Sequence, residues 1–428
     1  MKKEKKTIAQ KLASGKAGKP SFILYHILMI VVRIWNRHLH THFTYKVRPG
    51  KDKGPFVYIA NHASRNDFLF TAPACLPHRL NYVVGYNEFF RFPLNLVFKF
   101  MNVIPKRNFT PDVHTIHEIM RVIKRGGRIC FMPEGMSSIT GMQQPVVPGG
   151  GKLLKKLGVP VYYSKISGGY LTYPKHTMIS RPGKIEVVVD RMFTPEELKE
   201  LTPEEIEDRM NMLLAHDDYI WNETAKIKFG KGDNRAEKIN TLLYRCCKCG
   251  AEGKMTVDGN VIKCSECGNA VELDPYYQIS PVGEGSVCPK YVTDWVIEER
   301  KVAEKQVREE NFSYSGRVRI GFLPEYKFLK GDSTSVISGE GILKLDREGL
   351  HFDGTNNGEP FSFDISSDNL PTYGMCTDIS RIYTFIDGDF IEFYPESNDV
   401  LKWLHLTEEV HRANGGKWQN TSYRHRQD

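Results

Sequence analysis

The chain has 428 residues, of which 40% are hydrophobic and 26% are charged. These proportions are those of a globular protein, and the length predicts two or three domains. They exclude a collagen-like or low-complexity chain. The net charge of +8 is unevenly distributed, because residues 1–20 contain seven lysines and a single acid, Glu4.

An apolar run follows this basic segment at residues 22–32 (FILYHILMIVV), and Ile34 and Trp35 come after Arg33. A helix of about 14 residues is about 21 Å long, which is shorter than the ~30 Å hydrocarbon core of a bilayer. We therefore expect residues 1–40 to form a basic amphipathic segment at the membrane interface, peripheral or monotopic, on the cytoplasmic face. A buried first helix of the domain is the alternative. A signal peptide is a third reading, although no small-residue cleavage site follows the run.

Strand-like and helix-like runs alternate between about residues 54 and 190. This alternation predicts an α/β domain over residues 41–230, with a central, mostly parallel sheet covered on both faces. Functional residues are then expected at strand ends. The expected strands are 56–60, 81–84, 127–131, 159–163 and 184–189, and the expected helices begin at Asp67 and cover 93–101, 111–125 and 151–157.

The pattern changes after a polar boundary at residues 229–242. Interleaved charges predict a solvated connector within 276–312, and period-two alternation from Gly316 predicts short antiparallel strands in residues 313–428. Asp387-Gly388 is a type I′ hairpin signal, and a final helix is expected over 398–413. By its architecture this segment resembles a β-rich pleckstrin- or GRAM-like barrel capped by a C-terminal helix.

Five of the nine cysteines lie between positions 246 and 267, which is typical of a metal site in a reducing compartment and not of a disulfide framework. Two C-x-x-C-G knuckles predict a zinc ribbon over residues 240–275, with Zn²⁺ bound by Cys246, Cys249, Cys264 and Cys267. Four protein ligands leave no open position, so we expect a structural metal. The stretch between the knuckles has balanced charge and no aromatic residue, so we do not expect nucleic-acid binding.

His62 and Asp67 follow the strand FVYIA in the sequence NHASRND. Five helical steps would place them about 140° apart, so they meet only if His62 lies in the turn before a helix that begins near Asp67. Such a pair suits a general base whose tautomer is held by a carboxylate. Three further blocks follow in order: VIPKR at 103–107, FMPEG at 131–135 and GVPV at 158–161.

Taken together, the four blocks resemble the glycerophospholipid acyltransferase family typified by 1-acylglycerol-3-phosphate acyltransferases, over residues 50–190. The resemblance implies that His62 deprotonates an acceptor hydroxyl, which attacks the thioester of acyl-CoA or an acyl carrier protein, while Asp67 stabilises the imidazolium. It implies that Arg107 binds the acceptor phosphate and that Glu134 and Gly135 position the acceptor. A guanidinium suits phosphate because it is a planar bidentate donor.

Met136 and Ser137 replace the Thr and Arg that follow Pro-Glu-Gly in the family. The expected reaction is acyl transfer to lysophosphatidate at a membrane surface. An acyltransferase for another lipid or amphiphilic alcohol stays open, as does a non-catalytic membrane scaffold. The oligomeric state is not predicted.

Overall fold

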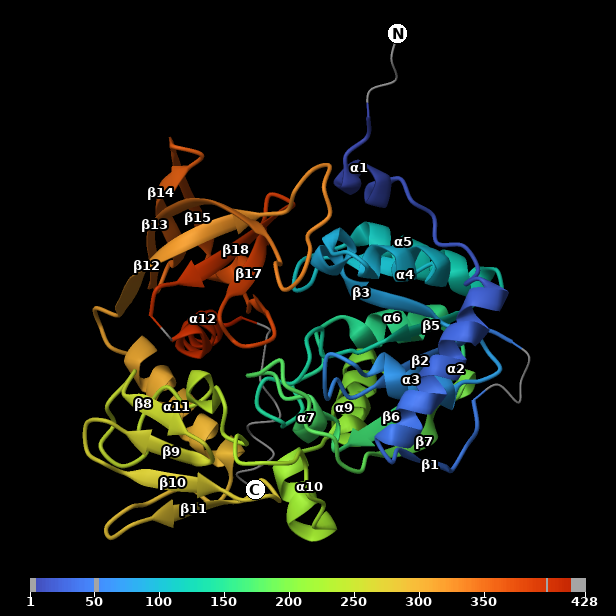
Figure 1. Cartoon of the computed structure of the whole chain (residues 1–428). Helices are drawn as coiled ribbons and strands as arrows, with labels where there is room; N and C mark the ends of the chain where they lie inside the picture. Colours follow the sequence, from blue (N-terminus) through green and yellow to red (C-terminus); the bar gives the residue numbers. More distant parts are fainter. Residues whose placement is uncertain (1–4, 50–53, 398, 417–428) are drawn as a thin grey trace.

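The computed structural model describes residues 5–49, 54–397 and 399–416 (Figure 1). Lys2, Lys3 and Glu4 of the predicted basic segment, and Asn398 at the expected start of the last helix, lie outside the described residues. Within the described residues the strands form three sheets. The first belongs to the N-terminal half of the chain, and the other two follow it in sequence (Figure 1).

The first sheet is the mostly parallel sheet that the sequence predicts. Its strand order is β1-β7-β6-β2-β5-β3-β4, and β6 with β7 is its antiparallel pair. The parallel order places the carboxyl ends of β2, β5 and β6 side by side. The strands are β1 (His42–Tyr45), β2 (Phe56–Ala60), β3 (Asn81–Gly85), β4 (Ile104–Lys106), β5 (Arg128–Phe131), β6 (Val161–Ser167) and β7 (Glu186–Phe193).

Strand β2 is buried on both faces because helices cover both sides of the sheet. Phe56 and Tyr58 pack into one apolar cluster with residues of α2 and α3, whereas Val57 and Ile59 pack into another with residues of α5, α6 and α9. The helices of this half are α1 (Ile8–Ala13), α2 (Phe22–His38), α3 (Phe68–Ala74), η1 (Tyr86–Phe90), α4 (Leu94–Met101), α5 (Val113–Lys124), α6 (Gly150–Leu157), α7 (Gly169–Thr172), α8 (Pro195–Glu200), α9 (Pro203–Leu214) and α10 (Asp218–Ala225).

Helix α2 presents two different apolar faces. Tyr25, Met29 and Val32 are buried against the domain, while Ile23 and Ile34 on the other side are 68% and 67% exposed. One face of α2 therefore packs against the domain, and another face leaves apolar side chains exposed. Among the described residues, no helix combines the length and the apolar character needed to cross a membrane.

The second sheet is small and antiparallel, with strand order β11-β10-β9-β8. It contains the paired cysteine turns described below. Its strands are β8 (Met255–Asp258), β9 (Val261–Cys264), β10 (Ala270–Leu273) and β11 (Ile279–Val282), and the short helix η2 (Ile239–Thr241) precedes it.

The third sheet is antiparallel, with order β15-β14-β13-β12-β18-β17-β16, and helix α12 (Val400–Ala413) follows it. This agrees with the predicted β-rich C-terminal part closed by a helix. Asp387 and Gly388 both have positive φ values between β17 and β18, as the predicted type I′ turn requires. The strands are β12 (Ser313–Phe322), β13 (Val336–Asp346), β14 (Gly349–Asn356), β15 (Glu359–Ser366), β16 (Gly374–Met375), β17 (Ile382–Ile386) and β18 (Asp389–Pro395), with η3 (Ser367–Asn369) between β15 and β16.

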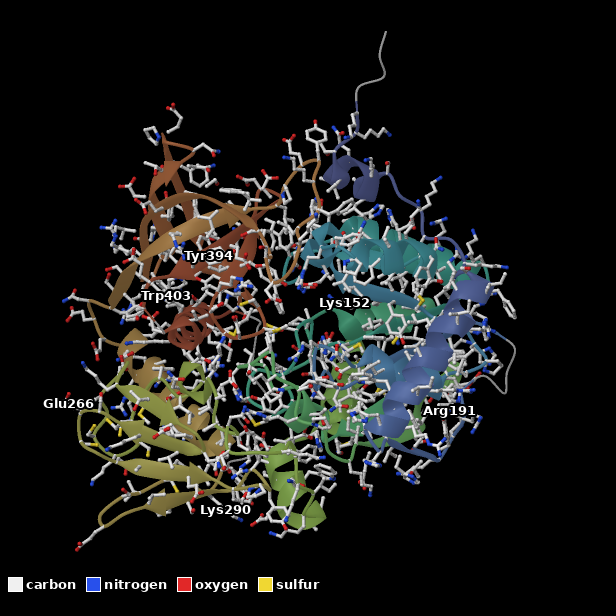
Figure 2. The ribbon with its side chains drawn as sticks, viewed as in Figure 1. Lys152, Arg191, Glu266, Lys290, Tyr394 and Trp403 are labelled. Atoms are coloured by element: carbon white, nitrogen blue, oxygen red, sulfur yellow. The ribbon has the colours of Figure 1, made fainter. Side chains whose placement is uncertain are left out.

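The prediction of a solvated connector before this sheet is wrong. Helix α11 (Val292–Val307) is largely buried, including Trp295 and its charged residues Glu299 and Arg300. Arg300 forms ion pairs with Glu408 at 2.6 Å and Glu409 at 2.9 Å on α12. The charge of Arg300 is thus paired inside the protein. In the sequence, a helix with buried, paired charges and a helix with a solvated charged face show the same interleaving of acidic and basic residues. Side chains fill the space around α12, where Trp403 is also fully buried (Figure 2).

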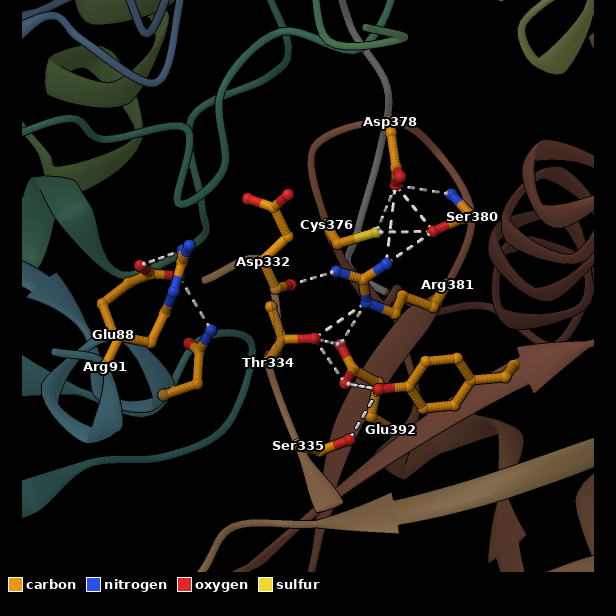
Figure 3. A network of polar contacts seen from close by, with 12 residues as sticks. Glu88, Arg91, Asp332, Thr334, Ser335, Cys376, Asp378, Ser380, Arg381 and Glu392 are labelled. Atoms are coloured by element: carbon orange, nitrogen blue, oxygen red, sulfur yellow. Dashed lines mark hydrogen bonds and ion pairs between the residues drawn. The ribbon is translucent and has the colours of Figure 1, made fainter. Parts of the chain in front are cut away.

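The C-terminal sheet contacts the first domain through the loop between β12 and β13. Leu329 in this loop exchanges backbone hydrogen bonds of 2.8 Å with Phe90 and Phe92. The end of the same loop is fixed by Arg381, which donates to the Asp332 carbonyl at 3.1 Å and to Thr334 Oγ1 at 2.8 Å. Figure 3 shows this polar network beside Glu88 and Arg91 of the first domain. The two parts of the chain are therefore joined at this loop.

Candidate active site

The loop after β2 is fixed by Asn61. Its side chain accepts from the backbone N–H of Ile166 at 2.7 Å and donates to the Ile166 carbonyl at 2.9 Å. Asn61 is buried, so this pair of bonds joins the ends of β2 and β6 in a water-poor setting. The next residue, His62, is thereby placed at the carboxyl edge of the sheet, where active sites of α/β domains form.

The structure brings His62 and Asp67 together in the turn-to-helix geometry that the spacing requires. His62 Nδ1 lies 2.8 Å from Asp67 Oδ2, and Asp67 immediately precedes α3. The carboxylate is buried, whereas the His62 side chain is 23% exposed. Ser64 donates to Asp67 Oδ1 from its backbone N–H at 3.0 Å and its hydroxyl at 2.8 Å. With Nδ1 donating to Asp67, Nε2 of a neutral His62 is left as an acceptor for a proton.

Glu134 contacts the backbone of the loop that contains His62. Its Oε1 accepts from the His62 backbone N–H at 2.7 Å, and its Oε2 accepts from the Gln144 backbone N–H at 2.9 Å. Burial raises the pKa of Glu134 to about 8, against the lowering effect of these two donors. Ser138 also donates from its backbone N–H to the His62 carbonyl at 2.7 Å. The Pro-Glu-Gly turn therefore supports the backbone of His62, and not its imidazole.

Gly135 cannot be replaced without strain. Its φ is +76°, and a Cβ at this position would lie 3.0 Å from Val147 and 3.1 Å from Phe109. The glycine thus lets the turn pack tightly against the loop that follows β4. That loop contains Arg107, one of the predicted site residues.

Arg107 itself makes its contacts away from the His62–Asp67 pair. Its guanidinium lies over the Tyr86 ring, 5.2 Å from the ring centre, and its backbone N–H donates to Asp112 at 2.8 Å. It does not line the hollow beside His62. The structure thus brings His62, Asp67, Glu134 and Gly135 together, whereas Arg107 contacts Tyr86 and Asp112.

A second histidine–carboxylate pair, which the sequence reasoning missed, lines the same hollow. His216 Nε2 lies 2.6 Å from Asp218 Oδ1. Asp218 also accepts from the backbone N–H groups of Gly168 and Tyr170, both at 2.8 Å. The close spacing of His216 and Asp218 in the sequence could have indicated this pair. The two residues lie far along the chain from the four blocks, so nothing in the sequence linked them to His62. The hollow is lined by Asn61, His62, Ala63, Glu134, Ser138, Gly141, Gln143, His216 and Asp218.

Lys175 is a second residue that the sequence reasoning missed. It is buried, and its Nζ donates to Ser137 Oγ at 3.1 Å, two residues beyond Gly135. Burial lowers the pKa of Lys175 to about 8. Asp378, in the loop between β16 and β17, donates from its backbone N–H to the Lys175 carbonyl at 2.7 Å. The cationic side chain of Lys175, which is not part of the Pro-Glu-Gly block, therefore lies beside Ser137, the residue that replaces the family's arginine.

The four predicted metal ligands form one cluster. The Sγ atoms of Cys246, Cys249, Cys264 and Cys267 all lie within 4.8 Å of one another. The Cys246–Cys267 and Cys249–Cys264 sulfur pairs are each 3.8 Å apart. Four thiolates around Zn²⁺ at 2.3 Å have S–S separations of about 3.8 Å, so the cluster fits tetrahedral zinc.

Both knuckles have the backbone that a metal turn needs. Gly250 and Gly268 have positive φ values, and each donates its N–H to the carbonyl of the first cysteine of its knuckle at 3.0 Å. Lys248 donates from its backbone N–H to Cys246 Sγ at 3.4 Å. The extra cysteine, Cys247, instead contacts the Val287 carbonyl through its Sγ at 3.4 Å, which agrees with its expected place outside the ligand set.

Comparison with known proteins gives one family and a few solved structures. The acyltransferase family model matches residues 38–164, a range that contains His62, Asp67, Arg107, Glu134 and Gly135. A search of curated proteins finds no match. The 1-acyl-sn-glycerophosphate (LPA) acyltransferase PlsC from Thermotoga maritima is 18% identical, with a TM-score of 0.37, over 44% of this chain and 78% of that one. The Ran-binding domain of the nuclear pore component NUP2 from Ashbya gossypii is 12% identical, with a TM-score of 0.18, over 24% of this chain and 99% of that one.

Proposed function

We propose that the chain transfers a fatty acyl group from an acyl thioester to the hydroxyl of a lysophospholipid, because residues 38–164 match the acyltransferase family model. The thioester is acyl-CoA or acyl carrier protein, and the acceptor is lysophosphatidate. The observation that supports the proposal most strongly is the contact between His62 Nδ1 and the buried carboxylate of Asp67.

In the proposed reaction, His62 Nε2 takes the proton of the acceptor hydroxyl as its oxygen attacks the thioester carbonyl carbon. Asp67 stabilises the imidazolium that forms and keeps the ring in one orientation. Collapse of the tetrahedral intermediate then breaks the carbon–sulfur bond. The departing thiolate receives the proton from His62, so that the products are an ester and a free thiol.

Two cationic side chains support an acceptor with a negative charge. Lys175 lies beside Ser137 in the turn that follows Glu134, and Arg107 lies on the neighbouring loop. An ammonium group held in a buried setting interacts more strongly with an anionic group than an exposed lysine does. We therefore propose lysophosphatidate in preference to an uncharged alcohol, even though Met136 and Ser137 depart from the family's third block.

The exposed face of α2 supports a location at a membrane surface. This face consists of apolar side chains that the rest of the described chain leaves uncovered, and several lysines precede the helix. Apolar burial at the headgroup boundary and attraction to anionic lipids act together in such interfacial helices. We propose that α2 lies in the cytoplasmic face of the bilayer and brings the site to its lipid substrate. The exposed face contains Phe22, Ile23, Leu24, Ile27, Ile30, Val31, Ile34 and Trp35.

We also propose that the four-cysteine cluster binds one structural zinc ion. The residues present fit the metal in number and spacing, and all four coordination positions are filled by thiolates. The ion would hold the two cysteine knuckles together and so stabilise the second sheet, whose apolar residues pack into one cluster with residues of α11 and α12. It would take no direct part in acyl transfer, because no position is open to a substrate.

Release of free thiol from acyl-CoA tests the proposed function. The purified protein is offered lysophosphatidate, lysophosphatidylcholine, monoacylglycerol and a long-chain alcohol in separate reactions. We expect turnover to be fastest with lysophosphatidate. Equal or faster turnover of the uncharged alcohols would contradict the proposal that lysophosphatidate is the acceptor. Absence of thiol release with every acceptor and donor would contradict the acyltransferase activity itself.

A further inference from the structure

The side-chain amide nitrogen of Gln143 is a buried donor without a partner among the described residues. Gln143 is only 7% exposed, and its Nε2 makes no hydrogen bond to any described residue. A buried donor left unpaired costs stability, because its hydrogen bonds to water are lost and not replaced. Such a group in a native structure calls for an explanation, and one explanation is a ligand that completes the hydrogen bond.

The adjacent residue shows that this is not a general property of the loop. The amide of Gln144 donates to the carbonyls of Met136 and Ser137, at 3.4 and 3.3 Å. The backbone N–H of Gln143 is also used, donating to the His216 carbonyl at 2.8 Å. The Nε2 of Gln143 is thus unpartnered among the described residues, while the donors of Gln144 and the backbone N–H of Gln143 are bonded within the protein.

Gln143 lines the same hollow as His62. The loop that positions it is bonded to the site at several points. Gly141 donates to Ser138 Oγ at 2.9 Å, and Asp218 donates from its backbone N–H to the Gly141 carbonyl at 3.0 Å. A hydrogen-bond donor that is held in place before the substrate arrives can stabilise developing charge without reorganising.

Helices α11 and α12 lie near Gln143 as well. A second hollow is lined by Gln143 together with Val296 and Arg300 of α11 and Leu401 and Leu404 of α12. The family match ends at residue 164, so these helices lie outside it. Gln143 therefore lines both the His62 hollow and the second hollow, which helices outside the family match also line.

We propose that Gln143 is a further catalytic residue of the acyl transfer, donating a hydrogen bond from its amide to the carbonyl oxygen of the thioester. The inference rests on the proposed function. When the acceptor oxygen bonds to the carbonyl carbon, the π electrons of the carbonyl move to its oxygen, which becomes an oxyanion. The Gln143 N–H stabilises that charge while His62 holds the acceptor's proton. Re-formation of the carbonyl expels the thiolate, which takes the proton from His62.

Steady-state kinetics and thermal unfolding of the full chain test this role. Gln143→Leu and Gln143→Met remove the amide but keep a side chain of similar size. We expect kcat for acyl-CoA and lysophosphatidate to fall about 10²-fold in both, because loss of one oxyanion donor has effects of this size. The KM for acyl-CoA should change by less than about 3-fold, since the interaction strengthens only as charge develops. The midpoint of thermal unfolding should stay the same or rise, because no folded-state hydrogen bond is lost.

Gln278→Leu is the matched control. Its amide donates to the Tyr219 and Tyr276 carbonyls outside the hollow, so kcat should be unchanged. A kcat within about 3-fold of wild type in the Gln143 variants would overturn the proposal. So would a lowered unfolding temperature in both variants alongside lost activity, because that result assigns Gln143 a structural role. Wild-type protein that releases no thiol contradicts the proposed function, and the Gln143 role with it.

Discussion

The backbone N–H of His62 donates a 2.7 Å hydrogen bond to Glu134 Oε1, joining two residues 72 positions apart in the chain. Through this bond the Pro-Glu-Gly turn supports the loop that contains the candidate base. The carboxylate of Asp67 holds the imidazole from the other direction. The position of His62 is therefore set by two carboxyl groups, one acting on the backbone and one on the ring.

Asp67→Asn should lower kcat by roughly 10²- to 10⁴-fold while leaving the fold intact. An amide in place of the carboxylate no longer stabilises the imidazolium and no longer fixes the tautomer of His62. Initial rates of thiol release from acyl-CoA measure the effect. Asp364→Asn is a suitable control, because Asp364 pairs with His351 on the surface of the C-terminal sheet. A wild-type kcat in Asp67→Asn would show that the pair has no part in proton transfer.

Glu134 should give the free energy of unfolding a defined pH dependence. Its pKa is about 8 in the folded protein and about 4.5 in the unfolded chain, so folding binds a proton between these pH values. The contribution of Glu134 is fully present below about pH 4.5 and is lost as the pH rises through about 8. Relative to Glu134→Gln, the wild type should thus become less stable from pH 5 to pH 8. Urea unfolding at several pH values checks this, and a constant difference between the two proteins would refute it.

Cys264→Ser should abolish binding of one zinc ion per chain and lower the unfolding temperature. The substitution removes one of the four thiolates, and loss of a structural metal removes the binding free energy that it adds to folding. Metal content by mass spectrometry and thermal unfolding measure both effects. Cys247→Ser should keep the zinc, since the Sγ of Cys247 contacts the Val287 carbonyl instead. Equal zinc content in wild type and Cys264→Ser would rule out the cluster as the binding site.

Replacing Ile23, Ile30 and Ile34 by serine should weaken binding to vesicles by about 10-fold or more. These side chains are exposed on α2, so the substitution removes apolar surface available to lipid without opening a core cavity. Sedimentation with vesicles containing anionic lipid measures the bound fraction. Serine at Val282 and Val287, exposed apolar residues of the cysteine-rich part, is the control. Unchanged vesicle binding by the α2 variant would contradict the proposal that the exposed face of α2 binds the membrane.

The sequence predicted those parts of the site that lie within short local patterns. The run Phe56–Ala60 and the turn that follows it place His62 at a strand end, and the five-residue spacing permits the contact with Asp67 only in the geometry observed. The cysteine knuckles were equally predictable, because ligand spacing and glycine positions are local properties. Parallel strands bring their carboxyl ends to one edge, so the joining of the first and third blocks followed from the fold class.

Residues that reach the site through irregular loops were not predictable. His216 and Gln143 are positioned by contacts such as the one from the Gln143 backbone to the His216 carbonyl, which no periodic pattern reveals. Lys175 lies against Ser137 only because the chain after α7 folds back over the third block. Helix α11 was predicted as solvated because charge patterning does not show that Arg300 pairs with two buried glutamates on α12.

The most direct test of the account is thiol release from acyl-CoA with lysophosphatidate, measured in wild type and in His62→Ala. The account predicts steady turnover by the wild type and a loss of about 10³-fold or more in the variant, because the base that accepts the hydroxyl proton is gone. The variant should unfold at a similar temperature, since the His62 side chain is partly exposed and its backbone bonds remain. Equal rates in the two proteins would contradict the claim that His62 is the base.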